Sequence, residues 1–435
     1  MDARTTALSA LIACRRQGAW SDGALKEYIV RDRLDRRDAA FAARLCYGVM
    51  QNRMLLDVYL ESLLTGKLRD LQPVVLDILR LGAYQILFLD KVPVSAAVNE
   101  AVEQCKKYAN KRASGLVNGV LRNLARQKDR LPEPPDLSTR YSHPAELVEL
   151  LEKNVPAGML ESVLKADNES PATQVQINPL LADETAVLAE LDELEISHQP
   201  HPWLPGCFLL SGTGSMEQME LFRQGKLYVQ DAAAHLAALA AGVKPGMRVL
   251  DCCAAPGGKS FAAAMQMENC GSITSCDIHA HKTALIEKGA ERLGITIISA
   301  QQADASVPNE AWKESFDTVI ADVPCSGLGV IRKKPDIRYK DLRQTEALPE
   351  IQKKILENVS GYVKPGGVLL YSTCTILKRE NEEAVSAFLK AHPEFSLEPF
   401  QTPEKLDIPN GGMLTLYPGQ AETDGFFIAK LRKQA

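Results

Sequence analysis

Residues 248–261 read RVLDCCAAPGGKSF, and this stretch decides the fold of the chain. Val249 and Leu250 are typical of a buried parallel strand, and a sharp turn then leads into an alanine-rich helix. Gly257 and Gly258 remove the side chains that would keep a ligand off the backbone, while the start of the helix presents N–H groups without helical partners. Taken alone, the stretch indicates either a cofactor seat or a plain strand-to-helix connection.

Two phosphate-binding motifs are excluded at this turn. A P-loop requires glycine at the position that Cys253 occupies, and the Gly-x-Gly-x-x-Gly dinucleotide motif is absent. Asp251 stands at the end of the strand, where its carboxylate would repel a pyrophosphate and attract a positively charged ligand.

From Gly225 onward, strand-like and helix-like segments alternate, which indicates a doubly wound, mostly parallel sheet. Ligands of such sheets lie beyond the carboxyl ends of the strands. The predicted strands lie near Met247–Asp251, Ser272–Cys276, Thr296–Ala300, Phe316–Ala321 and Gly367–Ser372.

Acidic residues recur at these strand ends. Asp251, Asp277 and Asp322 each end a strand, and Asp304 follows another. One such aspartate is usually a helix cap or turn residue. Four at successive strand ends predict a ligand with a ribose for Asp277 and an adenine-like edge for Asp304.

Two cysteines stand at the same predicted edge. Cys325 follows the fourth strand and Cys374 the fifth, either as functional thiols facing the ligand or as a chance pair of buried thiols. None of the ten cysteines forms a Cys-x-x-Cys pair, so no metal site is expected. The basic segment 328–340 beside Cys325 is suited to holding a nucleic-acid backbone.

The charge of the chain is unevenly distributed. Residues 1–130 hold 22 Lys and Arg against 14 Asp and Glu, residues 131–240 hold 5 against 17, and residues 241–435 hold 23 against 24. A basic end joined to an acidic middle favours contact with a polyanion through particular faces, although a solvated helical surface would look the same. The 46% hydrophobic content and the lack of a membrane-length apolar run or signal peptide predict a cytoplasmic protein without membrane contact.

Segments before Gly225 are read as two further domains. Residues 3–127 show helical periodicity, and the proline-rich stretch after Leu131 marks a linker. A helix over 147–153, a strand over 173–178 and an acidic helix over 180–194 then predict a small α+β insert.

The motifs together carry a family resemblance. Residues 251–260, the Asp322-Val-Pro-Cys-Ser-Gly motif and Ser372-Thr-Cys with Glu380-Asn-Glu-Glu closely resemble the RNA 5-methylcytosine methyltransferases. The N-terminal region, with Gly115-Leu-Val-Asn-Gly-Val-Leu-Arg-Asn, looks like the NusB-like domain of the bacterial Sun/Fmu (RsmB) enzymes. The resemblance implies three domains: an all-α NusB-like domain over 1–135, the α+β insert over 141–236, and a Rossmann-like class I methyltransferase domain over 237–435.

The resemblance also implies a reaction and its residues. S-adenosylmethionine would be the methyl donor, and the acceptor would be cytosine 967 of 16S rRNA, in free or partly assembled small-subunit RNA. Cys374 falls on the nucleophile, Cys325 on the cysteine that assists product release, and Asp322 faces both base and cofactor. The implied cofactor-binding residues are Ala254, Ala255, Pro256, Gly257, Gly258, Lys259, Ser260, Asp277, Asp304 and Asp322.

The partner is expected to be RNA, and the protein a monomer. Other expected RNA contacts are Lys106, Lys107, Arg112, Arg332, Lys333 and Lys334. Two alternatives stay open: a 5-methylcytosine methyltransferase acting on tRNA or 23S rRNA, and a non-catalytic assembly factor that binds rRNA. A nucleotide-dependent oxidoreductase is disfavoured because the pyrophosphate motif is missing.

Overall fold

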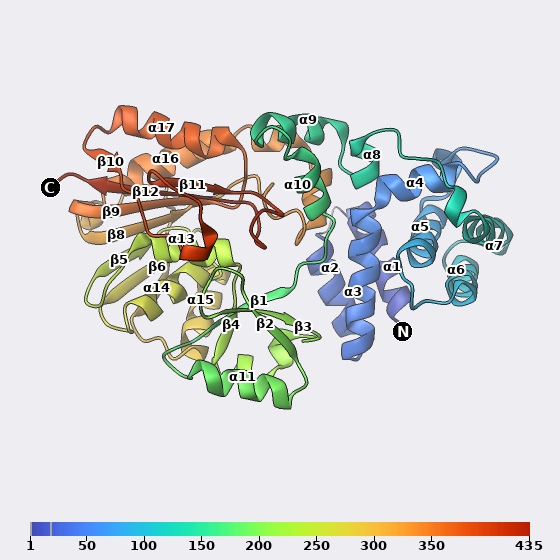
Figure 1. Cartoon of the computed structure of the whole chain (residues 1–435), viewed down its shortest axis with the longest axis horizontal. Helices are drawn as coiled ribbons and strands as arrows, with labels where there is room; N and C mark the ends of the chain where they lie inside the picture. The colour runs from blue at the N-terminus through green and yellow to red at the C-terminus, as the bar shows by residue number, and fades with distance from the viewer. Residues whose placement is uncertain (1, 18–19) are drawn as a thin grey trace. The chain divides into compact units, whose positions relative to one another are not determined.

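The computed structural model describes residues 2–17 and 20–435, which form two compact units (Figure 1). The helical unit comprises Met1–Glu152, Leu164–Glu169 and Ile331–Lys340, and the sheet unit comprises Lys153–Val163, Ser170–Val330 and Asp341–Ala435. Ile331–Lys340, called here the inserted segment, therefore leaves the sheet unit and returns to it, which the sequence did not predict.

The helical unit is built from amphipathic helices around one apolar core. In α7, Val117, Val120 and Leu124 are buried at helical spacing, while Arg122 and Arg126 are exposed, because the apolar stripe faces the bundle. The first seven helices are α1 (Ala3–Gln17), α2 (Ser21–Asp32), α3 (Arg36–Gln51), α4 (Arg53–Glu61), α5 (Pro73–Phe88), α6 (Val94–Tyr108) and α7 (Lys111–Arg126).

Three shorter helices follow the proline-rich linker. They are α8 (Leu137–Tyr141), α9 (Ala145–Asn154) and α10 (Leu160–Ala166). The helix predicted over 147–153 is therefore confirmed as α9, which begins earlier, directly after a proline.

The small insert is an antiparallel sheet in the order β2-β3-β1-β4. The strand predicted over 173–178 is β1, and the acidic helix is shorter than predicted because the Asp183 carboxylate accepts from Thr185 N–H and caps its start. The elements are β1 (Thr173–Ile177), α11 (Glu184–Glu193), β2 (Ser197–Pro200), β3 (Cys207–Ser211), α12 (Glu220–Arg223) and β4 (Leu227–Val229).

The large sheet has eight strands in the order β10-β12-β9-β8-β5-β6-β7, with β11 paired to β12. All five predicted strands are present, as β5 (Arg248–Asp251), β6 (Ser272–Asp277), β7 (Ile298–Gln302), β8 (Phe316–Asp322) and β9 (Val363–Thr373), and they pair in parallel. The antiparallel strands β10 (Phe395–Leu397), β11 (Met413–Leu416) and β12 (Phe426–Lys433) were not predicted.

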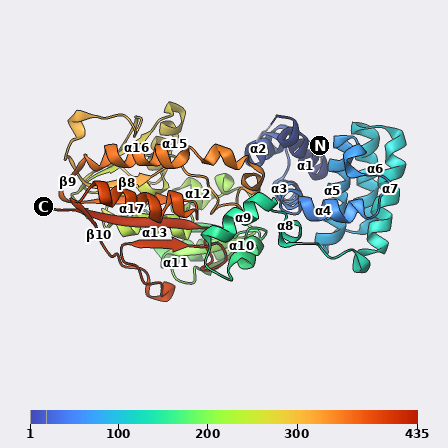
Figure 2. The ribbon, with the colours of Figure 1, turned by 90° about the horizontal axis from the view of Figure 1, so that it is seen from above.

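Helices cover both faces of this sheet (Figure 1), so its parallel strands are apolar on both sides. Val249 and Ile320 pack with α13 (Ala232–Ala241), α14 (Gly258–Gln266) and α15 (Ala280–Arg292). Leu250 and Val319 pack on the other face with α16 (Leu348–Ser360) and α17 (Glu382–Ala391), which Figure 2 shows alongside each other. The predicted fold class is confirmed.

The strand order reverses between β5 and β8, because β6 and β7 follow on one side and β9 on the other. Such a switch point opens a crevice at the carboxyl ends of the strands. Asp251 and Asp322 end these two neighbouring strands, and the register places Asp322 opposite Ser372 of β9.

Two features are absent from residues 2–17 and 20–435. Within these ranges no helix combines the length and the apolar character needed to cross a membrane. The same ranges contain no group of three His, Cys, Asp or Glu residues placed to hold a metal ion.

Candidate active site

The turn after β5 brings the predicted residues 254–260 to the switch point. Gly257 has φ +113°, and a Cβ atom on it would lie 2.3 Å from the Phe261 ring, so only glycine fits. No side chain caps the start of α14 at Gly257. The turn therefore presents backbone N–H groups where a small ligand could approach.

Asp251 lies fully buried beneath this turn. Ser260 Oγ donates to Asp251 Oδ2 at 2.7 Å and lies 2.7 Å from Ser275 Oγ. Asp251 Oδ1 is buried without a hydrogen-bond partner among the described residues. Burial raises the pKa of Asp251 to about 7. An orphaned acidic oxygen at this position fits a ligand that carries positive charge.

Asp277 and Asp304 stand at the ends of the next two strands. Asp277 Oδ1 accepts from His279 N–H at 2.9 Å, and the side chain is nearly buried. Asp304 is exposed, and its Oδ1 accepts from the Ser306 N–H and hydroxyl, which lowers its pKa. Both carboxylates hold their own local turns.

Asp322 connects the turn over residues 254–260, called here the glycine turn, to β9. Lys259 Nζ donates to Asp322 Oδ2 at 2.7 Å, and Ser372 Oγ donates to Oδ1 at 2.7 Å. Because both oxygens accept hydrogen bonds and one faces an ammonium group, the carboxylate acts here as an acceptor. The ammonium group of the buried Lys259 is thus paired with Asp322 in this structure.

The two predicted cysteines lie together beyond β8 and β9. Cys325 Sγ and Cys374 Sγ are 3.2 Å apart, and both side chains are half-buried. The hydrogen bond to Cys374, burial, and the negative charges of Glu380 and Asp322 raise the pKa of Cys325 well above its ordinary value. The raised pKa favours the protonated thiol at Cys325, and either sulfur can be the donor in the contact between the two residues.

Glu380 holds the turn that carries Cys325. Its side chain is fully buried, and Oε2 accepts from Ser326 N–H and from Gln352 Nε2, each at 2.9 Å. Gln352 Nε2 also donates to the Pro324 carbonyl at 2.9 Å. The backbone on both sides of Cys325 is therefore fixed by the same pair of side chains.

Asn381, the next residue, holds the loop that carries Cys374. Its Nδ2 donates to the Thr375 carbonyl at 2.9 Å, and its Oδ1 accepts from Thr373 Oγ1 at 2.6 Å. Ser326 Oγ lies 2.7 Å from Thr375 Oγ1 and joins the two loops. Adjacent residues thus set the spacing between the two thiols.

The residues predicted to contact RNA differ in exposure. Lys106 and Lys107 are exposed at the end of α6, and Arg112 is exposed at the start of α7, where it borders a cavity of about 310 Å³. In the inserted segment, Lys334 is exposed, Lys333 half-buried and Arg332 buried. The basic character of this segment is therefore only partly available to a nucleic acid.

Gln352 and Asn381 had no predicted role. Gln352 shares the buried face of α16 with Ile355, Leu356 and Val359, and a polar residue on an apolar stripe is the signal that could have identified it. Asn381 stood inside the Glu380-Asn-Glu-Glu motif, but its contacts depend on how β9 and η7 (Lys378–Glu380) meet.

Family models match almost the whole chain. Residues 238–432 match the model of the 16S rRNA methyltransferase RsmB/F, and residues 1–126 match that of the NusB family. Residues 143–217 match the ferredoxin-like domain of RsmF/B-like methyltransferases.

Similar proteins match this chain over nearly their full length. The chain is 38% identical to the probable ribosomal RNA small subunit methyltransferase B of Bacillus subtilis, over 99% of this chain and 98% of that protein. It is 34% identical to the corresponding Synechocystis protein over the full length of both.

Solved structures share the fold. The crystal structure of PH0851 superposes with a TM-score of 0.81 at 26% identity, covering 98% of each chain. NSun6 from Pyrococcus horikoshii with SFG gives a TM-score of 0.59 at 21% identity, over 67% of this chain and 98% of that one.

Proposed function

This chain belongs to the family of ribosomal RNA small subunit methyltransferase B and is an RNA methyltransferase, and we propose that it methylates carbon 5 of one cytosine in 16S rRNA. The observation that carries the proposal is the pair of thiols 3.2 Å apart, beside Asp322 and the glycine turn. The target we propose is cytosine 967, in free or partly assembled small-subunit RNA, and we propose that the protein acts as a cytoplasmic monomer.

S-adenosylmethionine is the proposed donor, since the residues at the switch point fit it. The turn 254–260 offers backbone N–H groups, Asp277 offers an acceptor for ribose hydroxyls, and the buried Asp251 favours positive charge nearby. Asp304 and Asp322 are the remaining cofactor contacts we propose. When bound, this cofactor supplies a methyl group on a positively charged sulfur.

Cys374 is the proposed nucleophile. Carbon 5 of cytosine is too poor in electrons to take a methyl group unaided, and addition of the Cys374 thiolate to carbon 6 moves electron density onto carbon 5. In this proposal the Cys325 thiol is the donor of the contact between the two sulfurs, which stabilises negative charge on the Cys374 sulfur before the addition.

The adduct must then lose the carbon 5 proton before the carbon–sulfur bond breaks. Cys325 is the nearest thiol and is proposed to assist this elimination, either as a thiolate that accepts the proton or through a water molecule that accepts it. Asp322, with both oxygens placed as acceptors, is suited to bind the exocyclic amine of the base.

The base must leave its stack to reach these groups. Unstacking costs a few kcal/mol and is easiest in a loop or unfolded segment. We propose that Lys106, Lys107 and Arg112, with Lys334 and Lys333, contact the flanking phosphates, which positions the RNA without reading its sequence. Arg332 remains a proposed contact only if the segment rearranges, because its side chain is buried.

Bisulfite sequencing of total RNA tests the proposal. We expect one 16S cytosine to lose protection in a deletion strain, and wild-type protein to restore it while the Cys374→Ala variant does not. Loss of protection at a tRNA or 23S position would reassign the substrate. An unchanged pattern at every position would favour the non-catalytic assembly factor.

A further inference from the structure

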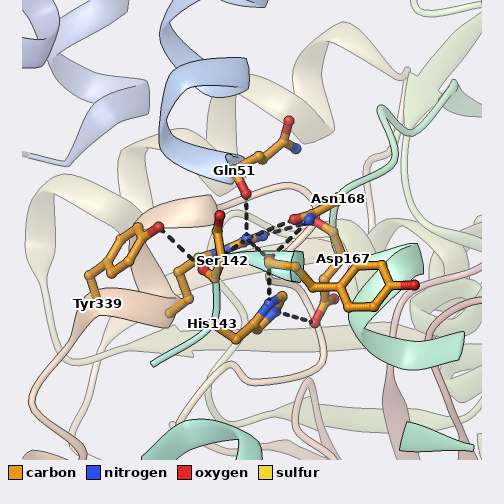
Figure 3. Close-up of polar contacts among 8 residues, drawn as sticks. Gln51, Ser142, His143, Asp167, Asn168 and Tyr339 are labelled. Carbon is orange, nitrogen blue, oxygen red and sulfur yellow. Dashed lines mark hydrogen bonds and ion pairs between the residues drawn. The ribbon is translucent and has the colours of Figure 1, made fainter. Parts of the chain in front are cut away.

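The inserted segment is held in the helical unit by one buried cation. Arg338 is only 1% exposed, and its guanidinium donates to the backbone carbonyls of Gln51 (3.1 Å), Tyr141 (3.2 Å) and Asp167 (2.9 Å) and to Asn168 Oδ1 (2.7 Å). Figure 3 shows the labelled partners Gln51, Asp167 and Asn168 converging on this group. These acceptors come from three separate parts of the chain.

The acceptors share one property, which explains how a buried arginine is stabilised. Gln51 is the last residue of α3, Tyr141 the last of α8, and Asp167 follows the last residue of α10. Carbonyls at helix C-termini have no helical partner and carry partial negative charge. Arg338 therefore satisfies three helix ends together, and its charge is stabilised by their dipoles.

Two other residues of the inserted segment also contact helix ends. The Asp336 carboxylate accepts from the N–H and hydroxyl of Ser21, at the start of α2, where Trp20 provides no side-chain cap. Tyr339 donates to the Met50 carbonyl near the end of α3 at 2.9 Å, and the Arg53 guanidinium stacks 3.7 Å from its ring. The acid lies at a positive helix end and the cation at negative ones.

Neighbouring polar side chains contact the same residues that bind Arg338. His143 is fully buried and contacts the Tyr141 carbonyl (2.8 Å) and Asp167 Oδ2 (3.2 Å), and Asn168 Nδ2 also donates to the Tyr141 carbonyl (2.9 Å). Figure 3 shows His143 directed at Asp167. These contacts orient the carbonyls that Arg338 binds.

The chain that leads into the inserted segment is the loop carrying Cys325. Only residues 326–330 separate Cys325 from the first residue of the segment. Gly329 N–H donates to the Cys374 carbonyl at 3.0 Å, and Gly329 passes Gly425 so closely that a Cβ atom would lie 2.0 Å from its carbonyl oxygen. The backbone between Cys325 and the inserted segment thus also contacts the residue that carries the second thiol.

We propose that Arg338 is a positioning residue, which anchors the inserted segment in the helical unit and thereby fixes the loop that carries Cys325. The role in methylation rests on the proposed function, whereas the anchoring and the position of Cys325 do not. The inserted segment, which belongs to the helical unit, then holds one end of the loop that carries Cys325.

The test compares Arg338→Met and Arg338→Lys with the matched control Arg140→Met in the full-length protein. Arg140 lies one residue before Tyr141, but its side chain is exposed and pairs with Glu133. Trypsin cleavage after Lys333 and Lys340 reports anchoring. The rate at which a diazenedicarboxamide oxidises the two thiols to a Cys325–Cys374 disulfide, itself becoming the hydrazine, reports the position of Cys325.

For Arg338→Met we expect faster cleavage, slower disulfide formation, and a kcat lowered by roughly tenfold to a hundredfold, as small misplacements produce, with unchanged S-adenosylmethionine affinity. Arg338→Lys should recover part of each loss, because an ammonium group keeps the charge but not the planar fork. If Arg338→Met is insoluble, the same three measurements on Arg338→Lys test the proposal: the cleavage rate, the rate of disulfide formation and kcat.

If trypsin cleaves the soluble Arg338 variants at the same rate as the wild-type protein, the proposed anchoring is wrong. Faster cleavage with wild-type disulfide formation and kcat would overturn the positioning of Cys325. Absence of methylation by the wild-type protein would instead reject the proposed function, and cleavage and disulfide formation would still decide the present proposal.

Discussion

At the scale of single residues, the proposed chemistry depends on two sulfur atoms that lie 3.2 Å apart. The hydrogen-bond contact with Cys374, burial and the negative charges nearby raise the pKa of Cys325, which favours a protonated thiol at that position. This asymmetry supports the proposal that Cys374 is the nucleophile and Cys325 the assisting thiol.

Replacing each cysteine by alanine should give opposite outcomes. Cys374→Ala should abolish methylation, because no thiol is left to add to carbon 6. Cys325→Ala should still form the bond to RNA but release it slowly, so a protein–RNA adduct should persist on a denaturing gel.

S-adenosylmethionine affinity should be unchanged in both variants and serves as the control for folding. Turnover by Cys374→Ala would reject the assignment of the nucleophile. The absence of any adduct with Cys325→Ala would count against a release role for that thiol.

Asp251 should make stability depend on pH. Its pKa in the folded protein is about 7, above the ordinary value near 4, so the folded state binds this proton more tightly than the unfolded chain. Its contribution is therefore complete below about pH 4 and is lost as pH rises to about 7, at roughly 1.4 kcal/mol per unit of pKa shift.

Asp251→Asn keeps the shape and has no proton to lose, so its stability relative to wild type should rise with pH across this window. Urea unfolding between pH 5 and 8 measures the difference. Asp304→Asn is the matched control, since hydrogen bonds from Ser306 lower the pKa of that exposed carboxyl. Parallel stability curves for wild type and Asp251→Asn would contradict the prediction.

At the scale of elements, residues at the start of α17 hold the two loops that carry Cys325 and Cys374. Glu380 and Asn381 lie at the junction of η7 and α17, and each fixes one of the two loops that follow β8 and β9. Because the loops are held from the same junction, a change there should disturb both thiols.

Glu380→Ala should lower both stability and kcat. The change leaves the Ser326 N–H and Gln352 amide without their buried acceptor, at about 1–3 kcal/mol for each unsatisfied group. Glu380→Gln keeps an acceptor oxygen and should retain most activity. Melting temperature and single-turnover methylation measure the two effects.

The matched control is Glu383→Ala, an exposed glutamate in the first turn of α17. Equal losses in Glu380→Ala and Glu383→Ala would show that the helix, and not the contact to the Cys325 turn, is responsible.

At the scale of the whole molecule, two units share one continuous chain. The inserted segment makes the helical unit incomplete without residues 331–340, so removing residues 1–130 would expose Arg338 as well as delete the basic helices. Point variants are therefore the cleaner test of RNA binding.

Replacing Lys106, Lys107 and Arg112 together by alanine should weaken binding to rRNA and reduce its salt dependence. Each lost phosphate contact should lower the slope of log K against log salt by about 0.7–0.9. Filter binding at several salt concentrations measures the slope, and kcat at saturating RNA should be retained.

The control replaces Lys353 and Lys354 by alanine. Both are exposed on α16 and pair with Glu357 and Glu350. An equal fall in slope for both sets of variants would show a general charge effect and no contact by the helical unit.

Features that depend on neighbours along the chain or on strand order can be predicted from the amino-acid sequence. The apolar run ending at Asp251, the glycine turn and the two strand-end cysteines are local patterns, and parallel strands bring their carboxyl ends to one edge. For this reason the sequence alone predicts Cys325 and Cys374 at one site, and the structure brings their sulfurs to 3.2 Å.

The groups that these residues contact depend on how distant segments pack together, and local patterns do not predict them. The antiparallel strands β10, β11 and β12 form by pairing at the sheet edge, and the partners of Gln352 and His143 come from distant segments. Arg338 is the clearest case: in sequence it is one more cation of a basic segment, but three helix C-termini converge on it. A buried charge takes its role from dipoles that exist only once the helices are assembled.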